Sequence, residues 1–254
     1  MIIMTSNVWG YYFGNTVEGR DRGLADVFGK YGPDVLGLQE MTPSFYGSEL
    51  TGRLREGYRI LGAPGNCTPL AFRRSFSLAD WGFEQLRDTP DRDKSVTWAV
   101  LNDPETGKTF GACSTHFWWP EDEEAERIRL KNAEQLADLM TRLHREYGCP
   151  VFAFGDMNCT LSSGVFGVYE KAGIRHLWRE AEQRDDRSSM HGDPLPGEDG
   201  AFHGKRTADG FERSLDHIVA LGDGFAVERY SVIEDREVLD ATDHSPELAV
   251  IRWL

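Results

Sequence analysis

The order of extended apolar runs constrains the fold of this chain more than any other feature of its sequence. Several such runs follow one another between Arg59 and Thr115 with no helical pattern between them. Successive parallel strands need a crossover connection, usually a helix. The sequence therefore argues against simple alternating β-α-β winding, and it favours a mixed sheet or two stacked sheets.

Apolar periodicity predicts the individual elements. Strands are expected at Ile2–Val8, Asp34–Gln39, Pro69–Phe72, Val96–Leu101, Thr109–Thr115, Val151–Phe154, Leu215–Ala220, Phe225–Val232 and Leu248–Trp253. Helices are expected at Arg20–Tyr31, Ser44–Leu54, Glu123–Glu146 and Ser163–Ala172, of which Glu123–Glu146 has the clearest apolar stripe. The polar stretch Asp185–Phe211 is expected to be a functional or mobile loop. Since no linker interrupts the chain, we expect one domain over residues 1–254.

Composition narrows the classes of function. The 254 residues contain 28 Lys and Arg against 42 Asp and Glu, a net charge of −14. Duplex DNA binding depends on cationic side chains that displace counterions, so this charge disfavours a general DNA-binding surface. No apolar run has the length of a bilayer span, and the N-terminus lacks the pattern of a signal peptide. A cytoplasmic location is therefore expected, whereas the oligomeric state stays open.

Polar side chains stand at the ends of many of these predicted strands. The strand 151–154 ends in "GDMNC", and side chains two residues apart on extended backbone point the same way. Asp156 and Asn158 should therefore lean into one space, although Gly, Asp and Asn also form ordinary turns. Similar polar residues occur at the other ends: Asn7, Glu40, His116, Asp216, Asp243 and His244. Carboxylate and amide oxygens suit Mg²⁺ or Mn²⁺, and histidines suit acid-base work or anion stabilisation. The set indicates metal-assisted phosphoryl chemistry.

The pieces that carry these residues resemble the endonuclease/exonuclease/phosphatase superfamily of DNase I-like proteins. They are "MTSNVWG", "PDVLGLQE", "STHFWW", "FAFGDMNCT", "RSLDHIVA" and "ATDHSPELAVI", and they follow the family's order along essentially the whole chain. Two weaker pieces, "LRDTPDRDKSVTWAVL" and "AFHGKRTADGFERSLDHI", are similar to a bacterial subgroup whose substrates are mostly undefined. The resemblance implies an α/β fold, a four-layered α-β-β-α sandwich of two mixed, mainly antiparallel sheets, with the active site at one end.

The resemblance also implies roles. Glu40 matches the principal metal ligand, and Asn7 and Asp243 match residues that line or bind the same cation. Asp156 would position or deprotonate the attacking water. Asn158 would hold that water or a phosphate oxygen. His244 would face the scissile phosphate with its tautomer set by Asp216, while His116 would contact a non-bridging oxygen. Where many family nucleases carry a tyrosine or an acidic residue before "LAFRR", this chain has "GNCTP", which leaves the partner of His116 open.

Aromatic and basic residues near these strand ends are candidates for substrate binding. Trp9, Tyr11, Tyr12 and Phe13 follow Asn7, and Phe117, Trp118 and Trp119 follow His116. On rim loops such rings stack on bases or cover sugar rings, or they simply pack the loops onto the sandwich. Arg73, Arg74, His203, Lys205 and Arg206 could supply a local cationic pocket, and of these Arg73 and His203 are expected to bind substrate.

These features lead to one principal hypothesis and two alternatives. The hypothesis is a phosphodiesterase or nuclease that depends on Mg²⁺ or Mn²⁺ and acts on a small or single-stranded phosphoester. The alternatives are a phosphomonoesterase acting on a sugar or inositol phosphate, and a non-catalytic binding protein that kept the fold. The presence of Glu40, Asp156, Asn158, Asp243 and His244 together favours an enzyme.

Overall fold

Two stacked mixed sheets form the centre of the protein in the computed structural model, which describes residues 1–10 and 17–254. The first sheet has the strand order β10-β14-β15-β1-β2-β4-β3 and the second has the order β5-β6-β7-β8-β13-β9. The bounds in the first sheet are β1 (Ile2–Asn7), β2 (Val35–Gln39), β3 (Tyr58–Leu61), β4 (Leu70–Arg73), β10 (Gln183–Arg184), β14 (Phe225–Val232) and β15 (Glu247–Trp253). The bounds in the second are β5 (Ser77–Gln85), β6 (Ser95–Asn102), β7 (Thr109–His116), β8 (Val151–Asp156), β9 (Arg175–His176) and β13 (Asp216–Leu221).

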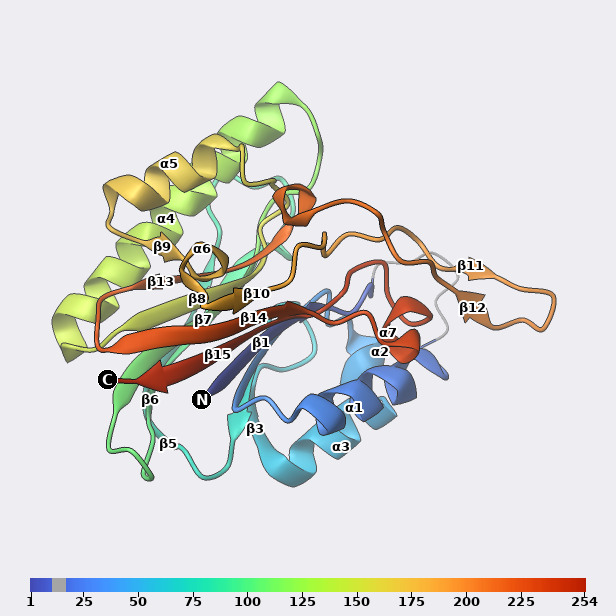
Figure 1. Cartoon of the computed structure of the whole chain (residues 1–254), viewed down its shortest axis with the longest axis horizontal. Helices are drawn as coiled ribbons and strands as arrows, with labels where there is room; N and C mark the ends of the chain where they lie inside the picture. The colour runs from blue at the N-terminus through green and yellow to red at the C-terminus, as the bar shows by residue number, and fades with distance from the viewer. Residues whose placement is uncertain (11–16) are drawn as a thin grey trace.

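Helices cover the two outer faces of the stacked sheets (Figure 1). On the first sheet lie α1 (Arg20–Tyr31), α2 (Pro43–Tyr46), α3 (Glu49–Gly57) and α7 (Arg236–Leu239), and on the second lie α4 (Glu123–Tyr147) and α5 (Gly164–Lys171). The short α6 (Leu177–Glu180) and a 3₁₀ turn, η1 (Phe211–Arg213), connect strands of the second half. The order of layers is helix, sheet, sheet, helix, so the predicted four-layered sandwich is confirmed.

Strand β8 shows why the sequence forms these layers. Its side chains alternate between two cores: Phe152 and Phe154 pack between the sheets, whereas Val151 and Ala153 pack under α4. A strand covered on both faces is apolar throughout, which is the pattern that predicted it. Gly37 of β2 leaves the space that the Phe154 ring occupies, because a Cβ there would lie 2.6 Å from that ring. The two sheets therefore approach closely near the end where β8 delivers Asp156.

The helix boundaries follow local signals. Helix α4 begins where the Asp122 side chain accepts a hydrogen bond from the Ala125 N–H, and it ends at Gly148 in the left-handed conformation with φ 62°. The helix predicted over Ser44–Leu54 is instead two helices, α2 and α3. Ser48 is extended between them, so the chain turns there and α3 restarts at Glu49.

One long connection and two strands depart from the sequence expectations. Strand β5 was not predicted, because it lies at a sheet edge and its residues alternate between exposed and partly buried, so it has no apolar run. Strand β3 is likewise an edge strand of partly exposed residues. The predicted loop 185–211 contains a small hairpin, β11 (Leu195–Pro196) and β12 (Phe202–His203), that projects from the sandwich (Figure 1).

Candidate active site

The predicted polar residues meet at one end of the sandwich because of strand direction. Strands β1 and β2 are parallel, as are β7 and β8, so the carboxyl ends within each pair lie together. Strands β13 and β15 are antiparallel to their neighbours β8 and β1, so they begin at that same end. In the second sheet Asp156 is in register with both His116 and Asp216. Three predicted site residues thus form one row across adjacent strands.

Asn7 links the two sheets at this end. Its side-chain Nδ2 donates to Oε1 of Glu40 at 3.1 Å and to Oδ2 of Asp156 at 3.0 Å. Its Oδ1 accepts from the backbone N–H of Trp9 at 2.9 Å. In this arrangement the amide nitrogen, not the oxygen, faces the two carboxylates. Asn7 therefore orients Glu40 and Asp156, and the oxygen that the predicted metal contact requires is turned to the backbone.

His244 and Asp216 form a buried pair. His244 Nδ1 lies 2.6 Å from Asp216 Oδ2, and both side chains are less than a tenth exposed. Burial alone would lower the pKa of His244, but the carboxylates of Asp216, Asp243 and Asp156 together hold it well above its ordinary value. These carboxylates favour the protonated imidazole, whose Nδ1 is occupied by Asp216 and whose Nε2 is turned to the other side, 3.9 Å from Asp243 Oδ2. A donor held in this way suits stabilisation of developing negative charge.

Asp156 lies between the two histidines. Its Oδ1 accepts from the Asn158 backbone N–H at 2.9 Å, and its Oδ2 lies 3.4 Å from His116 Nε2. Burial raises its pKa to about 6, and the charge of Asp216 adds to this, while His244 and Lys94 oppose it. The Asn158 side chain donates to the Phe117 carbonyl at 3.1 Å, which holds the amide against the end of β7. Both residues line the same cavity from one turn, although Asn158 has a φ of 48° and is not on the extended backbone that the prediction assumed.

Glu40 and Asp243 fit a divalent cation. Asp243 is buried, and this burial together with the neighbouring charge of Glu40 raises its pKa to about 7. Two carboxylates that repel each other across a water-accessible cavity are the donor set that a hard cation stabilises. A second group, Asp156, Asp216 and His244, offers ligand atoms within 4.8 Å of one another. In that group Asp216 and His244 already bond each other, so a metal ion bound there would have to displace this hydrogen bond.

These residues surround a cavity of about 790 Å³, within the size range of small-molecule sites. Six carboxylate residues line it: Glu40, Asp91, Asp93, Glu121, Asp156 and Asp243. The lining also includes His116, His244, Lys94 and Trp119. Asn158, Met190 and Leu215 also contribute. Met190 belongs to the long connection after β10, and its segment pairs with the one that carries His244. The loop predicted at 185–211 therefore supplies one wall of the site.

The candidates for substrate binding separate into one residue at the cavity and several elsewhere. Trp119 lines the cavity and is 61% exposed. Trp118 is partly buried next to it, with ring centroids 6.3 Å apart. Trp9 is buried, with its ring against Phe202 and the Arg20 guanidinium, so it packs the loop as the alternative interpretation held. Tyr11, Tyr12 and Phe13 lie outside the described residues.

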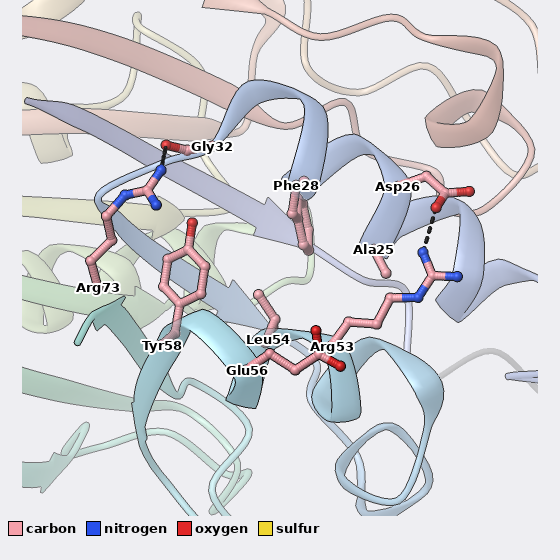
Figure 2. Close-up of a pocket in the computed structure, with 10 residues that line it drawn as sticks. Ala25, Asp26, Phe28, Gly32, Arg53, Leu54, Glu56, Tyr58 and Arg73 are labelled. Carbon is pink, nitrogen blue, oxygen red and sulfur yellow. Dashed lines mark hydrogen bonds and ion pairs between the residues drawn. The ribbon is translucent and has the colours of Figure 1, made fainter. Parts of the chain in front are cut away.

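Neither of the two predicted cationic residues lines the cavity. Arg73 ends β4, which is antiparallel to β2, so it lies at the opposite end of the sheet from Glu40. Figure 2 shows it in a separate pocket near α1, where it donates to Asp34 Oδ1 at 2.9 Å and to the Gly32 carbonyl at 2.6 Å. The prediction for Arg73 was wrong because strand direction had not been assigned. His203 is exposed on the β11–β12 hairpin and lies 3.2 Å from both carboxylate oxygens of Asp199.

Lys94 is the main site residue that the sequence reasoning missed. It precedes β6, only 1% of its surface is exposed, and its Nζ lies 2.8 Å from Nε2 and 3.1 Å from Nδ1 of His116. Burial lowers its pKa, against the opposing charges of Glu40, Asp156 and Asp91. Burial also lowers the pKa of His116 well below its ordinary value, and Lys94 and His244 add to this. The resemblance of "LRDTPDRDKSVTWAVL" to the bacterial subgroup was the one signal at Lys94.

A sandwich of this topology, with paired carboxylates and a charged histidine at one end, defines a class of phosphoester hydrolases. Comparison with family models agrees: residues 4–244 match the endonuclease/exonuclease/phosphatase family, so the chain belongs to that family. Members of this family hydrolyse phosphoesters and use divalent metal ions. No curated protein matches the sequence.

Solved structures with the same fold cover nearly the whole chain. An endonuclease/exonuclease/phosphatase from Bacteroides vulgatus is 21% identical with a TM-score of 0.78, covering 100% of this chain and 98% of that one. A mannosyl-6-phosphatase from Bacteroides thetaiotaomicron is 17% identical with a TM-score of 0.73, covering 100% of both chains. The catalytic domain of human Nocturnin is 16% identical with a TM-score of 0.75, covering 100% of this chain and 94% of that one. No helix within residues 1–10 and 17–254 is long and apolar enough to cross a membrane.

Proposed function

We propose that this protein is a divalent-metal-dependent hydrolase of small phosphoric esters. The observation that carries the proposal is the convergence of a charged donor, His244, and a carboxylate, Asp156, on one cavity whose wall includes the Glu40 and Asp243 pair. Glu40 and Asp243 would hold Mg²⁺ or Mn²⁺. When bound, the cation would neutralise charge on the phosphoryl group.

The chain's own residues would divide the remaining work. Asp156, whose Oδ1 is fixed by the Asn158 N–H, would orient water for in-line attack on phosphorus and accept its proton. His244 would donate from Nε2 to the oxygen on which negative charge grows, since Asp216 holds Nδ1. Asn7 would keep Glu40 and Asp156 at fixed separation.

The charge of the cavity favours a small substrate over a nucleic acid. Asp91, Asp93 and Glu121 line it beyond the catalytic residues, and they would repel the successive phosphates of a strand. Carboxylates beside an exposed indole suit instead the hydroxyls and ring of a phosphorylated carbohydrate. We therefore favour a monoesterase that acts on a sugar phosphate over a nuclease. A small phosphodiester, which the principal hypothesis of the sequence analysis also includes, fits the cavity equally well.

A substrate screen tests the proposal. The full chain is assayed with Mg²⁺, with Mn²⁺ and with EDTA on bis-p-nitrophenyl phosphate, p-nitrophenyl phosphate, sugar and inositol phosphates, and single-stranded oligonucleotides. We expect turnover of small esters only when metal is present. Glu40→Gln is the matched variant, because it keeps shape and removes one charge at the metal site. No turnover on any ester, or full turnover in EDTA, would contradict the proposal.

A further inference from the structure

Lys94 has no role in the mechanism proposed above, although it lines the same cavity. Lys94 lies just before β6, opposite the end of β7. Its backbone carbonyl accepts a hydrogen bond from the N–H of Leu86, which follows β5, at 2.9 Å. Its side chain then runs inward to the catalytic cavity, which it lines, while 99% of the residue is covered. A buried ammonium is costly unless charged or polar groups compensate it.

The cavity lining contains many more acidic side chains than basic ones, so the ammonium of Lys94 differs in charge from most of its surroundings. Among the described residues that line the cavity, Lys94 is the only lysine or arginine. Six carboxylate residues share the lining with it. A phosphate ester brings one or two further negative charges into this space, and cationic donors are the groups that bind phosphate strongly.

His116 lies closer to Lys94 than to its nearest carboxylate, which belongs to Asp156. Both ring nitrogens lie within 3.1 Å of Lys94 Nζ, whereas the nearest carboxylate oxygen, Asp156 Oδ2, is 3.4 Å from Nε2. Asn66 and Thr68 lie in the segment where many family nucleases carry a tyrosine or an acidic residue. Here Asn66 bonds Thr97 and Thr68 bonds Ser95. An imidazole nitrogen that accepts a hydrogen bond from an ammonium orients that ammonium.

We infer that Lys94 is a catalytic residue that binds a phosphoryl oxygen of the substrate, and that His116 is the positioning residue that aims its ammonium. This inference rests on the proposed function. It replaces the direct contact between His116 and a non-bridging oxygen that the family resemblance implied. The cation at Glu40 and Asp243, His244 and Lys94 would then surround the phosphoryl group with positive charge.

The test compares Lys94→Met, which keeps the apolar stem and removes the ammonium, with wild type and with Lys108→Met. Lys108 is a matched control because its Nζ bonds the Leu254 carbonyl on the surface, outside the cavity. We expect Lys94→Met to lower kcat/KM about 10²- to 10³-fold, the loss typical of one donor aimed at transition-state charge. Binding of inorganic phosphate, measured by calorimetry with Mg²⁺ present, should weaken about 10- to 100-fold, as for one charged hydrogen bond.

Two further measurements separate substrate contact from a structural or metal-linked role. Binding of Mn²⁺ alone should change by less than about threefold, because an ammonium cannot act as a metal ligand. Lys94→Ala should regain activity with added ethylammonium, since the cavity left by the side chain can hold the missing cation. A variant that merely loosened the fold would not respond to the amine.

A double-mutant cycle tests the role of His116. If His116 acts through Lys94, the double variant of Lys94→Met and His116→Ala should be no worse than Lys94→Met alone. Additive losses would overturn the positioning role. Wild-type phosphate affinity and turnover in Lys94→Met would overturn the inference itself, as would a parallel loss of Mn²⁺ binding. If wild type cleaves no ester, the proposed function fails, whereas the phosphate titration still tests Lys94.

Discussion

The pair of His244 and Asp216 allows the sharpest quantitative prediction. His244→Ala removes the donor whose Nδ1 is bonded at 2.6 Å to Asp216, in a pair whose side chains are both buried. Removal of one such donor lowers kcat about 10²- to 10³-fold, or about 2.7 to 4 kcal/mol of transition-state stabilisation. Asp216→Asn keeps the shape and loses one charge-assisted hydrogen bond, which contributes about 1.5 to 3 kcal/mol. We therefore expect Asp216→Asn to lower kcat roughly 10- to 100-fold, less than His244→Ala.

The assay measures kcat on the best ester from the screen, at saturating Mg²⁺, for both variants and for their combination. Because Asp216 acts only through His244, the combined variant should equal His244→Ala within about 0.5 kcal/mol. His144→Gln is the control for histidine loss, since His144 lies on α4 and its Nδ1 contacts the Cys149 carbonyl outside the cavity. Circular dichroism and thermal melting confirm that each variant folds.

Two results would refute this reasoning. Fully additive losses would show that Asp216 and His244 do not act as one unit. A folded His244→Ala variant with wild-type turnover would show that the charge on this imidazole is not used in catalysis. Asp156→Asn extends the test: it keeps size and removes the carboxylate that would accept the proton of water, so it should be at least as damaging as His244→Ala.

Three further predictions concern the metal, the rim and acid stability. Glu40→Gln should weaken Mn²⁺ binding at least tenfold in calorimetry, and an unchanged affinity would exclude Glu40 as a ligand. Trp119→Ala should raise KM more than it lowers kcat, whereas the exposed Trp81→Ala on β5 should change neither; equal effects would mean no ring contact with substrate. Burial lowers the pKa of His217 to about 4 from 6.5, so the unfolded state binds its proton first as pH falls. His217 by itself should then lower the free energy of unfolding by about 1.4 kcal/mol per pH unit between roughly pH 6.5 and 4, and wild type should lose this much more stability than His217→Gln in urea titrations.

The sequence predicted those parts of the fold where burial leaves a local signal. Strands buried on both faces, such as β8, are continuous apolar runs, and α4 has a stripe with an aspartate at its start and a glycine after its end. The edge strand β5 has neither pattern, because partial exposure on both faces allows polar residues throughout. The single domain over residues 1–254 stays a prediction.

The site was predicted where residues follow strand ends, and it was missed where the contact depends on pairing between strands. Asp156 and Asn158 are two residues apart in one turn, so both reach the cavity, although Asn158, with φ 48°, does not lie on extended backbone. The contact of Lys94 with His116 depends on the antiparallel register of β6 and β7, in which Val96 lies opposite Thr115. Nothing in "DRDKS" distinguishes a buried lysine from a solvated charge. The prediction for Arg73 was wrong for a related reason: the sequence shows that a basic residue ends a strand, but not at which end of the sheet that strand ends.

Backbone conformation at this end of the sandwich indicates how the geometry is maintained. Glu40 and Asn158 have positive φ angles of 58° and 48°, and Trp9 has 54°, in a region that side chains with a Cβ rarely occupy. Each such residue costs on the order of 1–3 kcal/mol and persists only where its surroundings hold it. Those surroundings are tight: a Cβ at Gly10 would lie 1.8 Å from the Glu40 carbonyl oxygen, and one at Gly155 would lie 1.9 Å from that of Thr115. The carboxylates are therefore fixed by backbone packed against backbone within each of the two sheets. Such a site is preorganised for charge stabilisation, since its donors and acceptors need not move when the reaction begins.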